Sequence, residues 1–346
     1  MKLFLDENAC RQQLRPFTYT RHVADIRIGI FTIREKWQLL TGSSPETDEQ
    51  KRSSGQLIIP ANIIPSQQNY KAILNAAEKG ELNSGNDFRL LNYPWQIFQY
   101  NDACLREDFE WIKQSKKTEP IPAGNQCIQE KDIFIEPGAE INFSILNAST
   151  GPIYIGKNAK VMEGSMIRGP FALGEGSILK MGTRIYGATS IGPFCLAGGE
   201  IKNSVFFEYS NKAHDGYLGD SVIGAWCNLG AGTSNSNVKN TGGEVKYFLD
   251  KSDAPLLAGN KAGLLMGDYS RAAINTSFNT GTVAGVCCNI FGETMTETHI
   301  PNFTWGRQRY ELDKAIRDIR NWKQMKQQEL TESEINILTG LYHSGK

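Results

Sequence analysis

The chain has 346 residues, of which 37 are basic and 37 acidic, so its formal charge at pH 7 is zero. Balanced charge gives no general attraction to nucleic acid or to an anionic membrane surface, and no apolar run is long enough to cross a bilayer. Seven cysteines form no Cys-x-x-Cys pair, which favours buried, reduced thiols in a cytoplasmic protein over a zinc site or a disulfide framework.

Strand and helix patterns alternate over residues 1–112, which predicts a small α/β domain. Residues 2–7 have the pattern of a strand, and residues 53–65 form another apolar run. Three further stretches have helical patterns: residues 24–40 (a strand or turn leading into a helix), 70–82, and 93–112 (a closing pair of helices). Residues 113–130 are polar and contain Pro120 and Pro122, so we expect a linker there.

The middle of the chain repeats every six residues. The repeated apolar positions are Ile155, Val161, Ile167, Leu173, Leu179, Ile185 and Ile191, with Ala197 next in phase. Neither helical periodicity nor strand alternation gives this period, whereas a three-sided coil does, with one short strand and one corner per six residues. We therefore predict a mainly β fold in which residues 131–305 form a left-handed parallel β-helix; a β-sandwich would need the spacing to arise by chance.

The apolar spacing becomes less regular after Ala197. Val205, Tyr217, Ile223 and Leu229 continue it, so we expect these four side chains to point inward. Residues 233–263 break the phase, which predicts a loop projecting from the solenoid. Insertions of this kind often carry the chemistry of a solenoid protein.

Residues 306–346 are predicted to be a helical tail. Thr331 and Glu334 have the spacing of a capping box. We expect the apolar face of the first helix to pack on the solenoid or on a neighbouring subunit. Its members are Leu312, Ala315, Ile316, Ile319, Trp322 and Met325.

Three stretches resemble a known family: GEIKNS (199–204), KAHDGYLGD (212–220) and IGAWCNLGAGT (223–233). They are similar to the acetyltransferase domain of the bifunctional N-acetylglucosamine-1-phosphate uridyltransferase / glucosamine-1-phosphate acetyltransferase, in a match without gaps over residues 182–232. The chain as a whole, including LRPFTYTR (14–21), resembles a branch of sugar nucleotidyltransferases that carry this solenoid. The resemblance implies a homotrimer that transfers acetyl from acetyl-CoA to the amine of an amino-sugar 1-phosphate.

The resemblance also implies two catalytic residues. His214 stands at the position of the general base, and an imidazole side chain suits that task at neutral pH. A solvent-facing loop histidine is the alternative. Glu200 would orient His214 or hold the sugar amine, or it forms an ion pair with Lys202.

Arg184 and Lys202 fall where the family binds the sugar phosphate. A phosphate suits a bidentate guanidinium together with a point cation, and a separation of eighteen residues predicts neighbouring coils on one face. Ordinary surface cations are the alternative.

Four further residues match substrate positions of the family. Tyr217 and Asn228 match contacts to the amino sugar, although inward packing of Tyr217 and a turn role for Asn228 are alternatives. Ala231, through its backbone, and Asn237 match contacts to acetyl-CoA.

This sequence also departs from the family. Val238 stands where the known enzymes have tyrosine, Lys246 is the nearest counterpart of a sugar-contacting lysine, and residues 272–275 contain no serine for the coenzyme.

The N-terminal domain departs further, because residues 7–21 contain no glycine to let backbone amides approach a nucleotide triphosphate. Arg11 and Arg15 are the residues to test there, and Mg²⁺ is implied only if this domain is active. Acetyl transfer is the leading hypothesis. Sugar-1-phosphate nucleotidyl transfer and non-catalytic binding of a sugar nucleotide are the alternatives.

Overall fold

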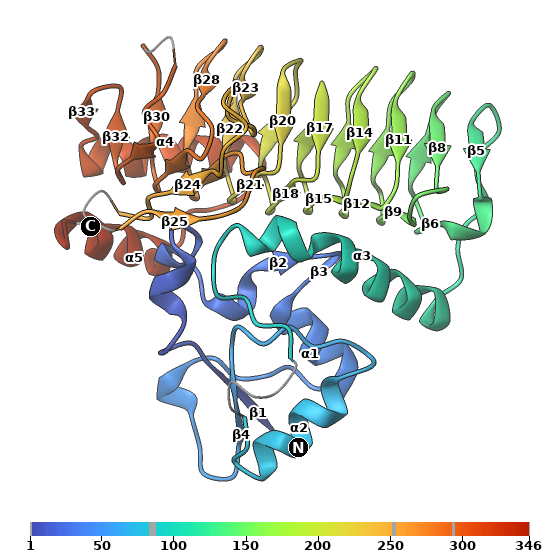
Figure 1. Ribbon diagram of the computed structural model, residues 1–346, viewed down its shortest axis with the longest axis horizontal. Helices are drawn as coiled ribbons and strands as arrows, with labels where there is room; N and C mark the ends of the chain where they lie inside the picture. The colour runs from blue at the N-terminus through green and yellow to red at the C-terminus, as the bar shows by residue number, and fades with distance from the viewer. Residues whose placement is uncertain (1, 83–87, 251–253, 293–294, 346) are drawn as a thin grey trace.

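The structure is a computed structural model that describes residues 2–82, 88–250, 254–292 and 295–345. A long parallel β-helix lies above a small N-terminal α/β domain, and two C-terminal helices pack at the far end of the solenoid (Figure 1). The predicted fold class is therefore confirmed. No helix within the described ranges is both long and apolar enough to cross a bilayer.

The N-terminal domain contains few elements. Its strands are β1 (Leu3–Asp6), β2 (Arg27–Ile28), β3 (Phe31–Thr32) and β4 (Leu57–Pro60), and its helices are α1 (Ile33–Thr41), α2 (Tyr70–Glu78) and α3 (Gln96–Ser115). β1 pairs with β4 in parallel, and Thr32 with Glu35 forms a capping box at the start of α1. The predicted pair of helices over residues 93–112 is wrong: one buried stripe, from Ile97 to Ile112, continues through a single helix.

The solenoid has three faces. The six-stranded sheet contains β5 (Gln126–Ile128), β8 (Ile145–Asn147), β11 (Met166–Arg168), β14 (Arg184–Tyr186), β17 (Glu200–Lys202) and β20 (Tyr217–Gly219). The nine-stranded sheet contains β6 (Ile133–Ile135), β9 (Ile153–Ile155), β12 (Phe171–Leu173), β15 (Thr189–Ile191), β18 (Val205–Phe206), β21 (Val222–Ile223), β26 (Leu265–Met266), β29 (Val283–Ala284) and β31 (His299–Ile300).

The ten-stranded sheet contains β7 (Glu140–Ile141), β10 (Lys160–Val161), β13 (Ile178–Leu179), β16 (Leu196–Ala197), β19 (Asn211–Lys212), β22 (Asn228–Leu229), β27 (Arg271–Ala272), β30 (Asn289–Ile290), β32 (Thr304–Trp305) and β33 (Gln308–Arg309). Beyond β20, the six-stranded face is continued by β23 (Ser234–Asn235) and β28 (Ser277–Phe278). The Asn235 amide bridges the change of sheet, because it accepts from the Gly219 amide and donates to the Gly219 carbonyl.

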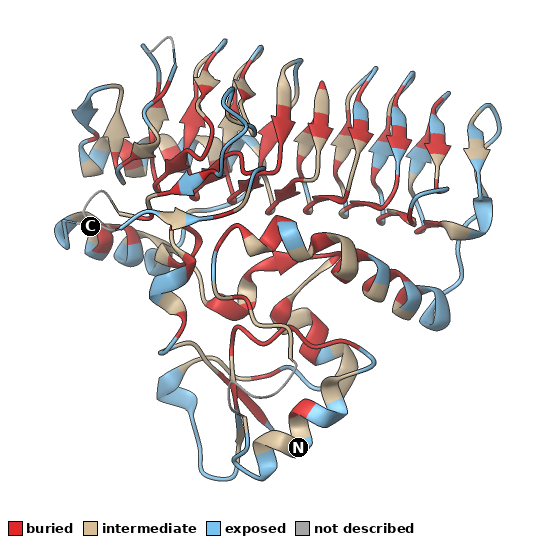
Figure 2. Cartoon of the chain, in the orientation of Figure 1, coloured by how far each residue is buried: buried red, intermediate tan, exposed pale blue. Residues whose placement is uncertain are grey.

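The six-residue period predicted the interior correctly. All eight repeated residues, from Ile155 to Ala197, are buried in one core cluster, and Figure 2 shows red, buried segments recurring from coil to coil. Stacking these side chains along the solenoid removes them from water in every coil.

The phase shifts after Ala197. Ile185 pairs with Ile201, sixteen residues later, and Ile201 pairs with Leu218. Phe206 and Leu218 therefore fill the interior, and the prediction that Val205 and Tyr217 point into this core is wrong. Ile223 and Leu229 do point inward, as predicted.

The described residues of the insertion over 233–263 do not form a loop that projects as a whole. Ser234–Asn235 is β23 of the solenoid, and β24 (Lys246–Tyr247) and β25 (Leu256–Leu257) pair next to the N-terminal domain, on which Tyr247 packs. Tyr247 is fully buried, its ring 5.4 Å from the Trp95 ring. Burial of this aromatic pair stabilises the folded-back arrangement.

The C-terminal helices are α4 (Leu312–Met325) and α5 (Glu332–His343). The predicted capping box of Thr331 and Glu334 is present. Ala315 and Ile319 are buried in a cluster shared with solenoid corners, which confirms packing on the solenoid. Met325, at the end of α4, is 75% exposed, so its inclusion in the buried face was wrong.

Candidate functional site

The outer side of the six-stranded sheet carries two rows of polar side chains. Arg184, Glu200 and Tyr217 lie opposite one another on β14, β17 and β20. Tyr186 and Lys202 form the next row, two residues further along their strands. Since alternate residues of a strand point to the same side, all five side chains face outward.

Arg184 and Lys202 lie on neighbouring strands of one face, as expected, but the reason given was wrong. The coil between them is two residues shorter than eighteen, so Arg184 lies opposite Glu200 and Lys202 lies opposite Tyr186. The Lys202 ammonium is 5.7 Å from the centre of the Tyr186 ring. Two cations therefore flank the same patch, offset along the strands.

Glu200 is held by its neighbours on β14. Its carboxylate accepts a hydrogen bond from the Tyr186 hydroxyl, and the Arg184 Nε lies 3.9 Å from Oε2. This hydrogen bond, aided by burial, raises the pKa of Tyr186 to about 12. The ion pair of Glu200 is therefore with Arg184, and within the described residues no hydrogen bond joins Glu200 to His214.

Tyr217 and Asn237 meet at the end of this face. The Asn237 side-chain amide lies 3.1 Å from the Tyr217 hydroxyl and also donates to the Asp220 carboxylate. Asp220 is 4% exposed and accepts a second amide, from Asn203, at 2.7 Å. Burial and the nearby Asp220 charge raise the pKa of Tyr217 to about 12.

Asn203 and Asp220 were missed by the sequence analysis. Both fall inside motifs that were recognised, GEIKNS and KAHDGYLGD. Their pairing depends on the register between β17 and β20, in which Lys202 lies opposite Gly219, so the residues that follow these two meet. The two motifs contain Asn203 and Asp220, but the sequence alone does not show that these two residues lie opposite each other.

His214 lies at the corner between β19 and β20. Its side chain is exposed, and its imidazole makes no hydrogen bond or ion pair within the described part of the chain. Its backbone carbonyl accepts from the buried Lys212 ammonium at 2.9 Å. The imidazole is therefore accessible, three residues before Tyr217 in the sequence.

Asn228 and Ala231 occupy other places. Asn228 is on the ten-stranded sheet, paired in register with Asn211 and Arg271. Ala231 is at a corner, where its carbonyl accepts from the Asn275 amide at 2.7 Å. The chain therefore places Asn228 around the corner from Tyr217, on a different face of the solenoid.

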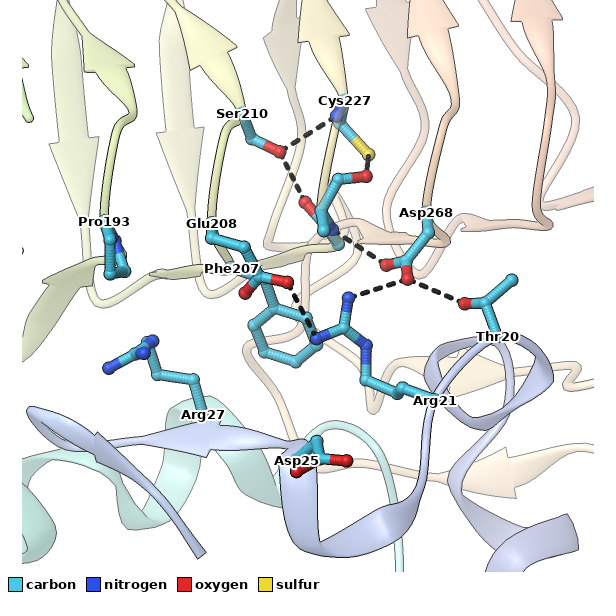
Figure 3. Close-up of polar contacts among 12 residues, drawn as sticks. Thr20, Arg21, Asp25, Arg27, Pro193, Phe207, Glu208, Ser210, Cys227 and Asp268 are labelled. Atoms are coloured by element: carbon cyan, nitrogen blue, oxygen red, sulfur yellow. Dashed lines mark hydrogen bonds and ion pairs between the residues drawn. The ribbon is translucent and has the colours of Figure 1, made fainter. Parts of the chain in front are cut away.

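The N-terminal motif LRPFTYTR packs against the solenoid. Figure 3 shows Arg21 between two solenoid carboxylates, 2.7 Å from Asp268 and 3.3 Å from Glu208. Thr20 donates to Asp268 at 2.7 Å. Phe17 packs on Phe207, with ring centres 5.3 Å apart.

Charge complementarity makes this contact specific. Burial acts against charge on Arg21, but Asp268 and Glu208 outweigh it and raise the pKa of Arg21. Burial acts to raise the pKa of Glu208, but Arg21 outweighs it and lowers that pKa. The segment expected to hold nucleotide phosphates is thus engaged in the domain interface.

The two arginines proposed for testing in the N-terminal domain are also engaged locally. Arg11 contacts the Glu7 carboxylate, four residues earlier. The Arg15 guanidinium lies 5.3 Å from the centre of the Tyr19 ring.

Comparison with known proteins finds similarity to a sugar nucleotidyl transferase family and to bifunctional GlmU proteins. Residues 2–84 match the family described as sugar nucleotidyl transferase. A bifunctional protein GlmU from Methanocaldococcus jannaschii is 30% identical over 113 residues, which are 33% of this chain and 27% of that protein. A second, from Bartonella quintana, is 28% identical over 167 residues, 45% of this chain and 35% of that protein.

These matches confirm the predicted resemblance as a distant one, since the aligned stretches make up only about a quarter to a third of each relative. Among solved structures, an Arabidopsis UDP-N-acetylglucosamine acyltransferase aligns with a TM-score of 0.33 and 15% identity, covering 65% of this chain and 90% of that one.

Proposed function

We propose that this protein transfers an acetyl group from acetyl-CoA to the amine of an amino-sugar 1-phosphate. The observation that carries the proposal is the contact between Tyr217 and Asn237. The family resemblance implies a sugar contact for the first residue and a coenzyme contact for the second. Their hydrogen bond brings the residue proposed to contact the sugar, which accepts the acetyl group, next to the residue proposed to contact acetyl-CoA, which donates it.

The chemistry follows from the groups around this contact. Arg184 and Lys202 hold the phosphate, because a guanidinium and an ammonium complement its charge. Since Tyr217 accepts from Asn237, its own proton remains available for a sugar oxygen. Glu200, fixed by Tyr186, supplies a negative charge beside the bound amine.

His214 performs the proton transfer in this mechanism. The neutral amine attacks the thioester carbonyl, and the imidazole removes the proton from the nitrogen as the C–N bond forms. The tetrahedral intermediate then expels the coenzyme thiolate, and the imidazolium gives this thiolate the proton that it took from the amine. The products are the N-acetylated sugar phosphate and free coenzyme A.

The complete site lies between neighbouring copies in a homotrimer. Asn228 lies on a different face than Tyr217, between Asn211 and Arg271, which contact Lys326 and Trp322 at the C-terminal end of the chain, so its proposed sugar contact requires a sugar bound by a neighbouring copy. Ile145 and Met166 extend the Arg184 row as exposed apolar side chains, 39% and 46% exposed. Clustered exposed apolar residues are typical of contact surfaces. Light scattering should give about three times the 38.5 kDa chain mass, and a monomer would contradict the assembly.

The direct test combines acetyl-CoA with glucosamine 1-phosphate and follows free thiol together with the mass of the sugar product. Acetylated sugar formed in step with thiol supports the proposal. Absence of product with a panel of amino-sugar phosphates overturns it and favours non-catalytic binding.

Nucleotidyl transfer is the second candidate, because residues 2–84 match the sugar nucleotidyl transferase family. The engagement of Thr20 and Arg21 in the domain interface counts against it. Pyrophosphate release from a nucleoside triphosphate and a sugar 1-phosphate, with Mg²⁺, is its test.

A further inference from the structure

The corners that lead into the six-stranded face follow one rule. The residue directly before the strand carries a hydroxyl at β8, β11, β14, β23 and β28, where it is Ser144, Ser165, Thr183, Thr233 and Thr276, whereas Asn125 precedes the first strand, β5. The Lys180 carbonyl accepts hydroxyls from Ser165 at 3.2 Å and from Thr183 at 2.5 Å. Hydroxyl side chains thus add hydrogen bonds to carbonyls at these corners, where buried polar groups need partners.

The carbonyl of Ala273 is satisfied in the same way, further along the solenoid. Thr233 and Thr276 donate to it at 3.1 and 2.8 Å. The coils before and after His214 therefore share this hydrogen bond from a hydroxyl side chain to a corner carbonyl.

The two corners at His214 break this rule. Gly199 and Gly216 take the place of the hydroxyl residue there. A Cβ at Gly199 would lie 2.9 Å from the His214 carbonyl oxygen, and one at Gly216 would lie 2.1 Å from the Thr233 carbonyl oxygen. Close approach of the backbone excludes any side chain at these positions.

Lys212 supplies the missing donors from inside the solenoid. It lies opposite Ala197 on the inward side of the ten-stranded sheet and is 1% exposed. Its ammonium donates to the Gly198 carbonyl at 3.1 Å and to the His214 carbonyl at 2.9 Å. One buried side chain thus ties the His214 corner to the corner of the preceding coil.

We propose that Lys212 is a positioning residue for His214, fixing the backbone of residues 213–216 so that the imidazole is held at the outer face. The inference rests on the proposed acetyl transfer for its catalytic consequence. A core lysine is costly, because its charge is removed from water, whereas an apolar residue would fill the same space more favourably. The hydrogen bonds from Lys212 to the Gly198 and His214 carbonyls explain why a lysine occupies this buried position.

The test replaces Lys212 by methionine, which has a similar length and no N–H donor. We expect kcat for thiol release to fall by about 100-fold, the loss typical of small misplacement of a catalytic group, while the KM for the sugar phosphate stays within about twofold. Amide hydrogen exchange of residues 213–216 should become faster. Ser177→Ala is the matched control, since Ser177 donates to the Gly192 carbonyl at a different corner, and its kcat should not change.

Unchanged kcat and unchanged exchange in Lys212→Met would overturn the proposal. If that variant does not fold, Lys212→Gln, which keeps N–H donors on a shorter side chain, replaces it, and kcat and the exchange at 213–216 should then change together or not at all. A lower kcat with wild-type exchange, or faster exchange with wild-type kcat, overturns the proposal. If the wild-type protein transfers no acetyl at all, the proposed function fails, and the exchange rates alone decide whether Lys212 fixes this corner.

Discussion

Asn237 donates a hydrogen bond to the Tyr217 hydroxyl over 3.1 Å, although twenty residues separate them in the sequence. The same amide is oriented by the buried Asp220 carboxylate, which also accepts from Asn203. The position of Asn237 therefore depends on a carboxylate that contacts neither substrate in the proposed mechanism.

Asp220→Asn should disturb this network. An amide in place of the carboxylate presents N–H donors to the Asn203 and Asn237 amides, or leaves one of them without an acceptor. We expect the free energy of unfolding to fall by about 1–3 kcal/mol, the cost of a buried unsatisfied group. Urea unfolding measures it, with Asp102→Asn on exposed α3 surface as the control. Equal losses in both variants would contradict the role of Asp220.

Arg184→Met and Lys202→Met should each weaken sugar-phosphate binding. Hydrogen bonds to a charged group contribute about 1.5–3 kcal/mol, which corresponds to a KM roughly 10- to 150-fold higher with kcat little changed. Lys157→Met, at an exposed corner of the solenoid, is the control. If both site variants keep the wild-type KM, the phosphate assignment is wrong.

Arg21→Met should loosen the contact between the two domains. Asp268, 3% exposed, would lose the guanidinium and retain Thr20 and the Ala225 amide as donors. Breaking a buried ion pair costs about 3–5 kcal/mol, so the urea midpoint should drop clearly. Lys51→Met removes only an exposed pair with Asp48, and we expect a change of at most about 1 kcal/mol. A similarly small effect at Arg21 would be the contrary result.

Lys212 predicts a pH dependence of stability. Burial lowers its pKa from 10.5 to about 8, so between these values the unfolded chain binds the proton and the folded chain does not. The cost of the buried charge is complete below pH 8 and is relieved as pH rises toward 10.5. Relative to Lys212→Met, the wild-type free energy of unfolding should therefore rise across this interval, by about 3 kcal/mol at most.

Chemical denaturation of both proteins at pH 7.5 and 9.5 measures the difference. Use of the variant as reference removes the titration of other groups that the two proteins share. Parallel stability profiles would show that Lys212 does not titrate in this way.

The regular coils were predictable because apolar residues repeat where side chains stack, as from Ile155 to Ala197. The shortened coil between Ile185 and Ile201 was not, since close packing of Gly198 and Gly199 against the next corner depends on contacts between coils. The next coil, of seventeen residues, pairs Ile201 with Leu218, so Leu218 and not Tyr217 points inward. The insertion was misplaced because burial of Tyr247 depends on Trp95, in another domain.

Among the candidate residues, motif resemblance identified His214, Tyr217 and Asn237 one at a time. Their arrangement required the three-dimensional register. Lys212 could not be distinguished from a surface lysine by sequence, because its two carbonyl partners carry no side-chain signal.

The central claim is that His214 is the base in acetyl transfer, and thiol release by His214→Gln tests it most directly. Acetyl-CoA and glucosamine 1-phosphate are supplied at saturation, and His343→Gln, at an exposed position on α5, controls for loss of a histidine elsewhere. Loss of general base catalysis should lower kcat by about 10²- to 10⁴-fold, while His343→Gln keeps the wild-type rate. A His214→Gln enzyme that releases thiol and acetylated sugar as fast as wild type would contradict the account.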